Sequence, residues 1–166
     1  MTDARLAQAM ELRERGELEA ARELLLELRA ERPDDPRVAV ETAWVHDSLG
    51  HEEEAVGHYA AALAGELSQE ELQGAYLGLG STLRALGRDD DSDRVLRAGM
   101  QRCPDFRPLR AFHALTAYSR GDARDAVRTL IHLLLESSED PTVQRYRRSL
   151  TAYADDLDRS WLHGTG

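Results

Sequence analysis

Lysine and asparagine are absent from this sequence, and isoleucine and cysteine each occur once, at Ile131 and Cys103. A single cysteine excludes an intrachain disulfide framework and any zinc site built on several cysteines. Lysine, asparagine and isoleucine have AT-rich codons, so their scarcity indicates a GC-rich, bacterial genome. We therefore attach no functional meaning to the use of arginine at all 21 basic positions.

Positive charge is also scarce. The 166 residues include 31 acidic and 21 basic side chains, which gives a formal net charge of -10. Affinity for phosphate depends mainly on arginine and lysine, so this balance argues against nucleic acid or an anionic membrane as the partner. No apolar run approaches the length that spans a bilayer, and the first residues lack the pattern of a secretory signal. We expect a single-domain, cytoplasmic protein.

Four glycines recur at a nearly constant interval and organise the chain. The separations are 34, 37 and 34 residues, between Gly16, Gly50, Gly87 and Gly121. Small residues lie seven positions before each glycine, at Ala9, Ala43, Gly80 and Ala114, and five positions after it, at Ala21, Ala55, Ser92 and Ala126. Nine positions after each glycine comes a larger residue, at Leu25, Tyr59, Leu96 and Leu130. Small residues let two helices approach closely, and glycine suits the left-handed residue that ends a helix, so each copy predicts a helix, a tight turn and a second helix.

Helix starts are marked at several repeat boundaries. Asp35-Pro36 and Asp140-Pro141 each place a capping carboxylate before a first-turn proline. Ser68 followed by Glu71 fits a capping box. Almost no segment alternates in the manner of a strand. The chain is therefore predicted to be all-α, with repeats at about 2–35, 36–70, 71–106 and 107–140.

This spacing resembles the tetratricopeptide repeat family, whose 34-residue unit has small residues at the helix crossing, glycine at the turn and proline near its end. The resemblance covers roughly residues 3–141, and the three extra residues between copies two and three fall in the loop at 64–68. The stretches 44–50 and 79–87 are similar to small, free-standing bacterial members with no assigned activity. The resemblance implies a right-handed α-α superhelix of about four helix hairpins.

The pattern changes after Pro141. An apolar stripe at three- and four-residue steps comprises Val143, Tyr146, Leu150, Tyr153, Leu157 and Trp161. We predict one long helix over 141–162 that caps the last hairpin, with a disordered tail at 163–166. Alternatively, the stripe docks a second copy of the chain.

The resemblance also implies that the first helix of each hairpin lines a concave groove. The groove residues that it assigns are Met10, Arg13, Glu41, Trp44, Asp47, Ser81, Arg84, Phe112 and Tyr118. Asp47 and Arg84 either pair with a ligand or bridge each other, and Trp44 either contacts a ligand or packs between repeats. The family's carboxylate clamp is absent, because its places hold Leu6, Met10, Glu41, Gly74 and Gly78. Acidic groove residues favour a ligand with basic and apolar groups.

The sequence contains no strong catalytic or metal-binding motif. His51, Glu54 and His58 are interpreted as a solvated face, and His46 and His113 as hydrogen-bonded core histidines. The acidic run Asp89–Asp93 lacks the glycine and the glutamate of a calcium loop. No nucleophile with a base, no phosphate-binding loop and no metal motif stands out, so we expect neither an enzyme nor a cofactor.

The sequence therefore predicts a non-catalytic protein-interaction module that binds a peptide or protein segment in its groove. The alternative is a self-associating scaffold, a possible homodimer, that uses the C-terminal stripe. A third possibility, an enzyme or small-molecule sensor, requires a closed pocket with convergent polar groups.

Overall fold

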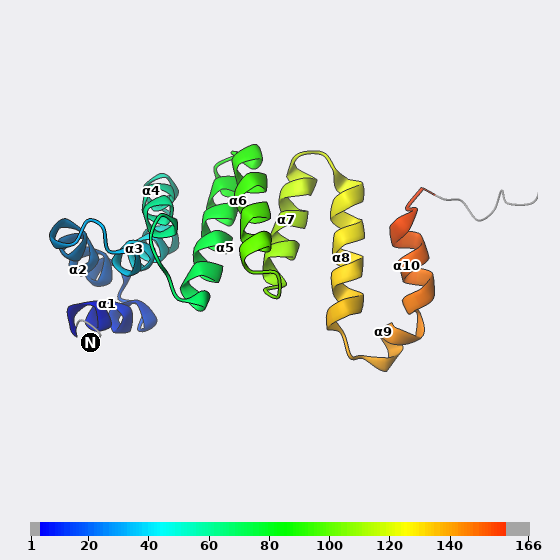
Figure 1. The fold of residues 1–166 in the computed structure, drawn as a ribbon, viewed down its shortest axis with the longest axis horizontal. Helices are drawn as coiled ribbons and strands as arrows, with labels where there is room; N and C mark the ends of the chain where they lie inside the picture. Colours follow the sequence, from blue (N-terminus) through cyan, green and yellow to red (C-terminus); the bar gives the residue numbers. More distant parts are fainter. Residues whose placement is uncertain (1–3, 159–166) are drawn as a thin grey trace, which may run out of the picture.

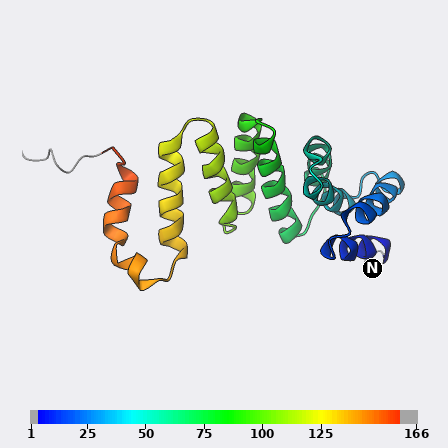
Figure 2. The same cartoon turned by 180° about the vertical axis from the view of Figure 1, so that it is seen from behind.

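The computed structural model describes residues 4–158, and within that range it contains ten helices and no strand. Four hairpins come first: α1 (Ala4–Glu14) with α2 (Leu18–Glu31), α3 (Pro36–Ser48) with α4 (Glu52–Leu63), α5 (Gln69–Ala85) with α6 (Asp89–Arg102), and α7 (Pro108–Ser119) with α8 (Ala123–Ser137). Two short helices follow, α9 (Pro141–Arg145) and α10 (Arg147–Asp155). The hairpins stand side by side in chain order along one long axis (Figures 1 and 2). The fold is the all-α solenoid that the repeat predicts.

The turns form where the glycine spacing places them. Gly16, Gly50, Gly87 and Gly121 have φ values of 78°, 76°, 72° and 88°. Other residues rarely adopt this left-handed conformation, because their Cβ would clash with the backbone. Each repeat therefore needs glycine at the end of its first helix, and this prediction is confirmed.

The small residues lie at the crossing of two helices. Ala9, Ala43, Ala21 and Ala55 are completely buried. At the third crossing, a Cβ on Gly80 would lie 2.5 Å from the side chain of Leu96, so only glycine permits this approach of α5 and α6. Long side chains at these positions would separate the backbones and open the hairpins.

Side chains cap the helices at the predicted starts. A carboxylate oxygen of Asp35 accepts hydrogen bonds from the backbone N–H groups of Arg37 and Val38, at 3.0 and 3.3 Å. Ser68 and Glu71 form both bonds of a capping box at the start of α5. These bonds satisfy backbone groups that the first turn of a helix leaves without partners.

The large residue nine positions after each repeat glycine is buried in the first three repeats but not in the fourth. Leu25, Tyr59 and Leu96 are at most 1% exposed, whereas the equivalent residue of the fourth repeat, Leu130, is 40% exposed. In the first three repeats the next hairpin covers this position. On α8 the cover is α10, which runs alongside it (Figure 1). The last flank of the array is therefore only partly buried.

The segment after Pro141 differs from the single long helix predicted over 141–162. The helix breaks at Tyr146, and α10 ends at Asp155. The reason lies in Gln144, whose side-chain amide donates hydrogen bonds to the carbonyl groups of Leu135 and Ser138, at 3.2 and 2.6 Å. These bonds hold α9 against the end of α8, so the chain turns back there before α10 begins.

The predicted stripe is also only partly buried. Tyr146 and Tyr153 are 59% and 48% exposed, while the fully buried side chain of α10 is Ala154, which the stripe does not include. Trp161 and the predicted tail at 163–166 lie outside the described residues. Among residues 4–158, no helix has the length and apolar character that a membrane crossing requires.

Candidate functional site

The nine predicted groove residues all lie on first helices of the hairpins. Met10 and Arg13 are on α1, Glu41, Trp44 and Asp47 on α3, Ser81 and Arg84 on α5, and Phe112 and Tyr118 on α7. Three of them pack against the core: Met10 in the first hairpin, Trp44 beside the cluster of the second hairpin, and Phe112 near Leu96 and Leu109. Tyr118 is 65% exposed and Ser81 is half-buried. The structure brings only the N-terminal members into mutual contact.

Arg13 connects the first two hairpins. Its Nε donates to a carboxylate oxygen of Glu41 at 2.9 Å, and its guanidinium carbon lies 5.3 Å from the centre of the Trp44 ring. Glu41 is 3% exposed. Burial raises the pKa of the Glu41 carboxyl above its usual value, although the nearby guanidinium opposes the change. Arg13 therefore makes a partly buried ion pair and a cation–π contact at the same time.

Asp47 and Arg84 do not bridge each other, so that interpretation was wrong. The Asp47 carboxylate accepts hydrogen bonds from the Tyr59 hydroxyl at 3.1 Å and from the Thr82 hydroxyl at 2.9 Å. The Nε of Arg84 instead donates across to α7, where it reaches the Ser119 hydroxyl at 3.0 Å. Each residue thus joins neighbouring hairpins through a different partner.

Two adjoining hollows meet at Trp44. The first has a volume of about 630 Å³ and is lined by Trp44, Gln69, Glu70, Gln73, Gly74 and Phe106. The second has a volume of about 430 Å³ and is lined by Arg13, Trp44, Asp47, Ser48, Tyr59 and Glu70. Their walls come from α3, the start of α5 and the loop between α6 and α7, and in the second hollow also from α1 and α4. A Cβ on Gly74 would lie 2.7 Å from the Trp44 ring, so the ring rests directly on that backbone.

Sequence reasoning missed several residues of these hollows. Glu70, Gln73 and Phe106 are not at the groove positions of the repeat pattern. Glu70 belongs to the first turn of α5, and Phe106 lies outside any helix. The capping box at Ser68 marked the helix start, but nothing in the periodicity showed that this end faces Trp44.

Two carboxylates that line the hollows, those of Asp47 and Glu70, form no ion pair with any residue that the structure describes. Hydroxyl groups alone bind Asp47, and within residues 4–158 no arginine or histidine forms an ion pair with Glu70. Other carboxylates nearby are neutralised: Glu41 by Arg13, and Glu71 by Arg37 at 2.9 Å. A cationic ligand would thus meet two carboxylates here that have no cation of their own.

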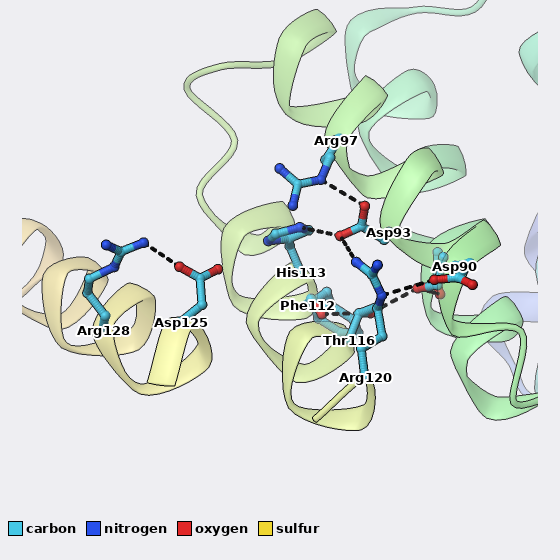
Figure 3. Close-up of polar contacts among 11 residues, drawn as sticks. Asp90, Asp93, Arg97, Phe112, His113, Thr116, Arg120, Asp125 and Arg128 are labelled. Atoms are coloured by element: carbon cyan, nitrogen blue, oxygen red, sulfur yellow. Dashed lines mark hydrogen bonds and ion pairs between the residues drawn. The ribbon is translucent and has the colours of Figure 1, made fainter. Parts of the chain in front are cut away.

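A separate polar cluster joins the third and fourth hairpins. Figure 3 shows the Asp93 carboxylate between three donors: the His113 Nε2 at 2.9 Å, the Arg97 Nε at 2.8 Å and the Arg120 Nη1 at 3.0 Å. Burial alone would raise the pKa of Asp93, but the hydrogen bonds from Arg97 and His113 bring it below its usual value. His113 is thus the hydrogen-bonded core histidine that the sequence predicts. The arrangement braces α6 against α7.

The three histidines of the α3–α4 hairpin depart from expectation. His46 is 5% exposed, but neither ring nitrogen has a hydrogen-bond partner. The rings of His51 and His58 stand beside it, with centroids 5.6 and 4.9 Å away, and both are half-buried rather than solvated. Burial lowers the pKa of His46, and burial followed by the charge of His46 lowers that of His58 to about 4. Across the described part of the chain, no three or more His, Cys, Asp or Glu side chains are arranged to hold a metal.

A row of helix hairpins, each with a left-handed glycine in its turn, defines an α-solenoid. This class of repeat protein presents extended binding surfaces. Residues 36–157 match the family model described as tetratrico peptide repeat, and the chain belongs to this family. Membership in it indicates a protein–protein interaction or scaffold module.

Solved structures of the same kind are similar to the chain. One is a thermophilic repeat protein from Thermus thermophilus, with 17% identity, a TM-score of 0.42, and coverage of 89% of this chain and 97% of that one. Another is a tetratricopeptide repeat protein from Parabacteroides merdae, with 16% identity, a TM-score of 0.42, and coverage of 95% and 79%. No curated protein matches the sequence.

Proposed function

We propose that this protein is a non-catalytic interaction module that binds a peptide or protein segment with basic and apolar groups. The binding place is the groove around Trp44, where the two hollows meet. The observation that carries the proposal is the combination of a half-buried aromatic ring that lines both hollows with two carboxylates, Asp47 and Glu70, that lack cationic partners.

The charge of the whole chain supports the same class of ligand. A formal charge of -10 attracts a basic segment and repels nucleic acid and anionic membranes. Arg13, the basic residue that lines the smaller hollow, is engaged by Glu41. An acidic peptide would therefore find no free cation at this place, and a basic peptide would find carboxylates.

The test is a comparison of proteins captured from a lysate by the wild type and by groove variants. We expect partners of the wild type to be lost by Trp44→Ala and by Glu70→Arg. The matched control is Glu53→Arg, which makes the same charge change at an exposed position of α4. Helicity and thermal melting are measured first, since Trp44 also packs on Gly74. Equal capture by wild type and folded Glu70→Arg would contradict binding in this groove.

A second candidate function is self-association as a scaffold, because the C-terminal end exposes apolar side chains. Leu130, Leu134 and Tyr146 are 40%, 47% and 59% exposed on α8 and at the α9–α10 junction. The helix α10 begins with Arg147-Arg148 and ends near Asp155-Asp156. Antiparallel pairing of this helix with its copy would place arginines opposite aspartates, which supports a two-fold homodimer.

A further inference from the structure

The larger hollow has the composition of a pocket for one long side chain. This Trp44–Phe106 pocket is lined by Trp44, Gln69, Glu70, Gln73, Gly74 and Phe106. Two aromatic rings supply apolar walls, the backbone of Gly74 supports the Trp44 ring, and three polar side chains come from consecutive turns at the start of α5. Such a pocket suits a side chain with an apolar stem and a polar end.

Arg13 shows what the Trp44 ring accepts. Its guanidinium lies 5.3 Å from the ring centre while it is paired with the Glu41 carboxylate. Arg13 lines the neighbouring hollow and not the Trp44–Phe106 pocket. The part of Trp44 that faces this pocket is therefore left for another group.

Glu70 gives the pocket its electrostatic preference. Its carboxylate lines both hollows and is exposed, and no cationic side chain among residues 4–158 pairs with it. A guanidinium can stack on an aromatic ring and donate hydrogen bonds to a carboxylate in its own plane, whereas an ammonium binds as a point charge. The combination of Trp44 and Glu70 thus favours arginine over lysine.

We propose that the Trp44–Phe106 pocket is a specificity pocket for an arginine side chain of the partner. The arginine stem lies between Trp44 and Phe106, and its guanidinium stacks on Trp44 and donates to Glu70. This assignment rests on the proposed function, because it names the residue of the partner that the groove recognises.

The experiment uses tryptophan fluorescence. The sequence has two tryptophans, so Trp161→Phe leaves Trp44 as the reporter. Into this protein we titrate an acetylated, amidated pentapeptide Leu-Ala-Arg-Ala-Leu, and then the same peptide with citrulline or lysine at its centre. Citrulline keeps the shape of arginine and removes the charge. We expect the citrulline and lysine peptides to bind about tenfold more weakly than the arginine peptide.

Variants locate the effect. Glu70→Gln is expected to abolish the preference for arginine over citrulline, and Phe106→Ala to weaken the arginine peptide, while Glu53→Gln on α4 leaves both unchanged. Circular dichroism confirms that each variant is folded. An arginine preference that survives Glu70→Gln, equal binding of the three peptides, or no binding of any of them would overturn the pocket assignment.

The lysate experiment and the peptide titration separate binding in the groove from recognition of arginine in the pocket. If Trp44→Ala and Glu70→Arg lose lysate partners but the arginine peptide shows no preference, the groove binds by other chemistry. If the peptide preference holds in the fluorescence titration, the pocket is assigned whatever the lysate provides.

Discussion

Tyr59 shows how one side chain joins three helices. It is 1% exposed, and its hydroxyl donates to Asp47 on α3 while its ring lies against Gly78 on α5. Burial, followed by the Asp47 charge, raises the pKa of the Tyr59 hydroxyl, so this donor stays protonated. The same Asp47 accepts from Thr82, which ties α5 into the contact. The aromatic residue nine positions after a repeat glycine is therefore the centre of an inter-hairpin junction.

The first prediction concerns the glycine on which Tyr59 rests. A Cβ on Gly78 would overlap the Tyr59 hydroxyl, so Gly78→Ala must displace a buried ring. We expect a loss of about 1–3 kcal/mol in the free energy of unfolding by urea, partly offset by the higher helix propensity of alanine. The matched control is Gly57→Ala on α4, where a new Cβ meets nothing within 4 Å. That variant should gain up to about 1 kcal/mol. Equal stability of the two variants would refute the packing argument.

The α3–α4 hairpin carries a cluster of three histidines, His46, His51 and His58. The charges that face it come from Arg22 and Arg29 on α2, which lower the pKa values, and from Glu19 on α2 and Glu54 on α4, which raise them. Burial has the larger effect, so the folded hairpin favours the neutral imidazoles of His46 and His58. Its stability should therefore depend on pH.

The direction of this pH dependence follows from the difference in proton binding between the folded and unfolded chain. The folded-state pKa of His58 is about 4, below the unfolded value of about 6.5, so between these values the unfolded chain binds more protons. Stability is full above pH 6.5 and is lost as pH falls towards 4. Because His58 is only half-buried, we expect His58→Gln to remove about 1 kcal/mol of the loss between pH 7 and pH 5.

The measurement is urea unfolding at pH 7 and pH 5. The control is His132→Gln on α8, a histidine outside the cluster that pairs with Asp155 at 3.1 Å. If wild type and His58→Gln lose the same free energy on acidification while both remain folded at pH 7, the cluster is not the source of the pH dependence.

The C-terminal end of the array leaves apolar side chains of α8 exposed, and these side chains could mediate self-association. A repeat array buries its last hairpin against a cap, and here α10 leaves Leu130 and Leu134 at 40% and 47% exposure. We expect the mass measured by sedimentation to rise with protein concentration. Leu134→Asp and Tyr146→Asp should each weaken association at least about tenfold, because a buried charge at an interface is costly.

The control places the same charge at the other end of the array. Leu26 on α2 is 39% exposed, so Leu26→Asp changes an equally accessible apolar side chain away from the flank. It should associate like the wild type. A wild-type protein that stays monomeric up to its solubility limit would remove the scaffold as a candidate.

The positions of the hairpins follow from the sequence. Turn glycines, crossing residues and caps act through the backbone within one repeat, so their spacing is sufficient to place α1 to α8. It also predicted a hydrogen-bonded core histidine at His113, which the bond of this side chain to Asp93 confirms. For the hairpins and for His113, the contact inferred from the repeat pattern is the one that the neighbouring helix makes.

Which long side chains meet depends on how the hairpins are arranged in space. The partners of Asp47 and Arg84, the unbonded ring of His46, and the approach of Glu70 and Phe106 to Trp44 depend on how successive hairpins are rotated against each other. The break at Tyr146 depends likewise on hydrogen bonds from Gln144 to the end of α8. Periodicity fixes which face a residue occupies. It does not fix the angle between hairpins, and over the length of an arginine or glutamate side chain that angle selects the partner.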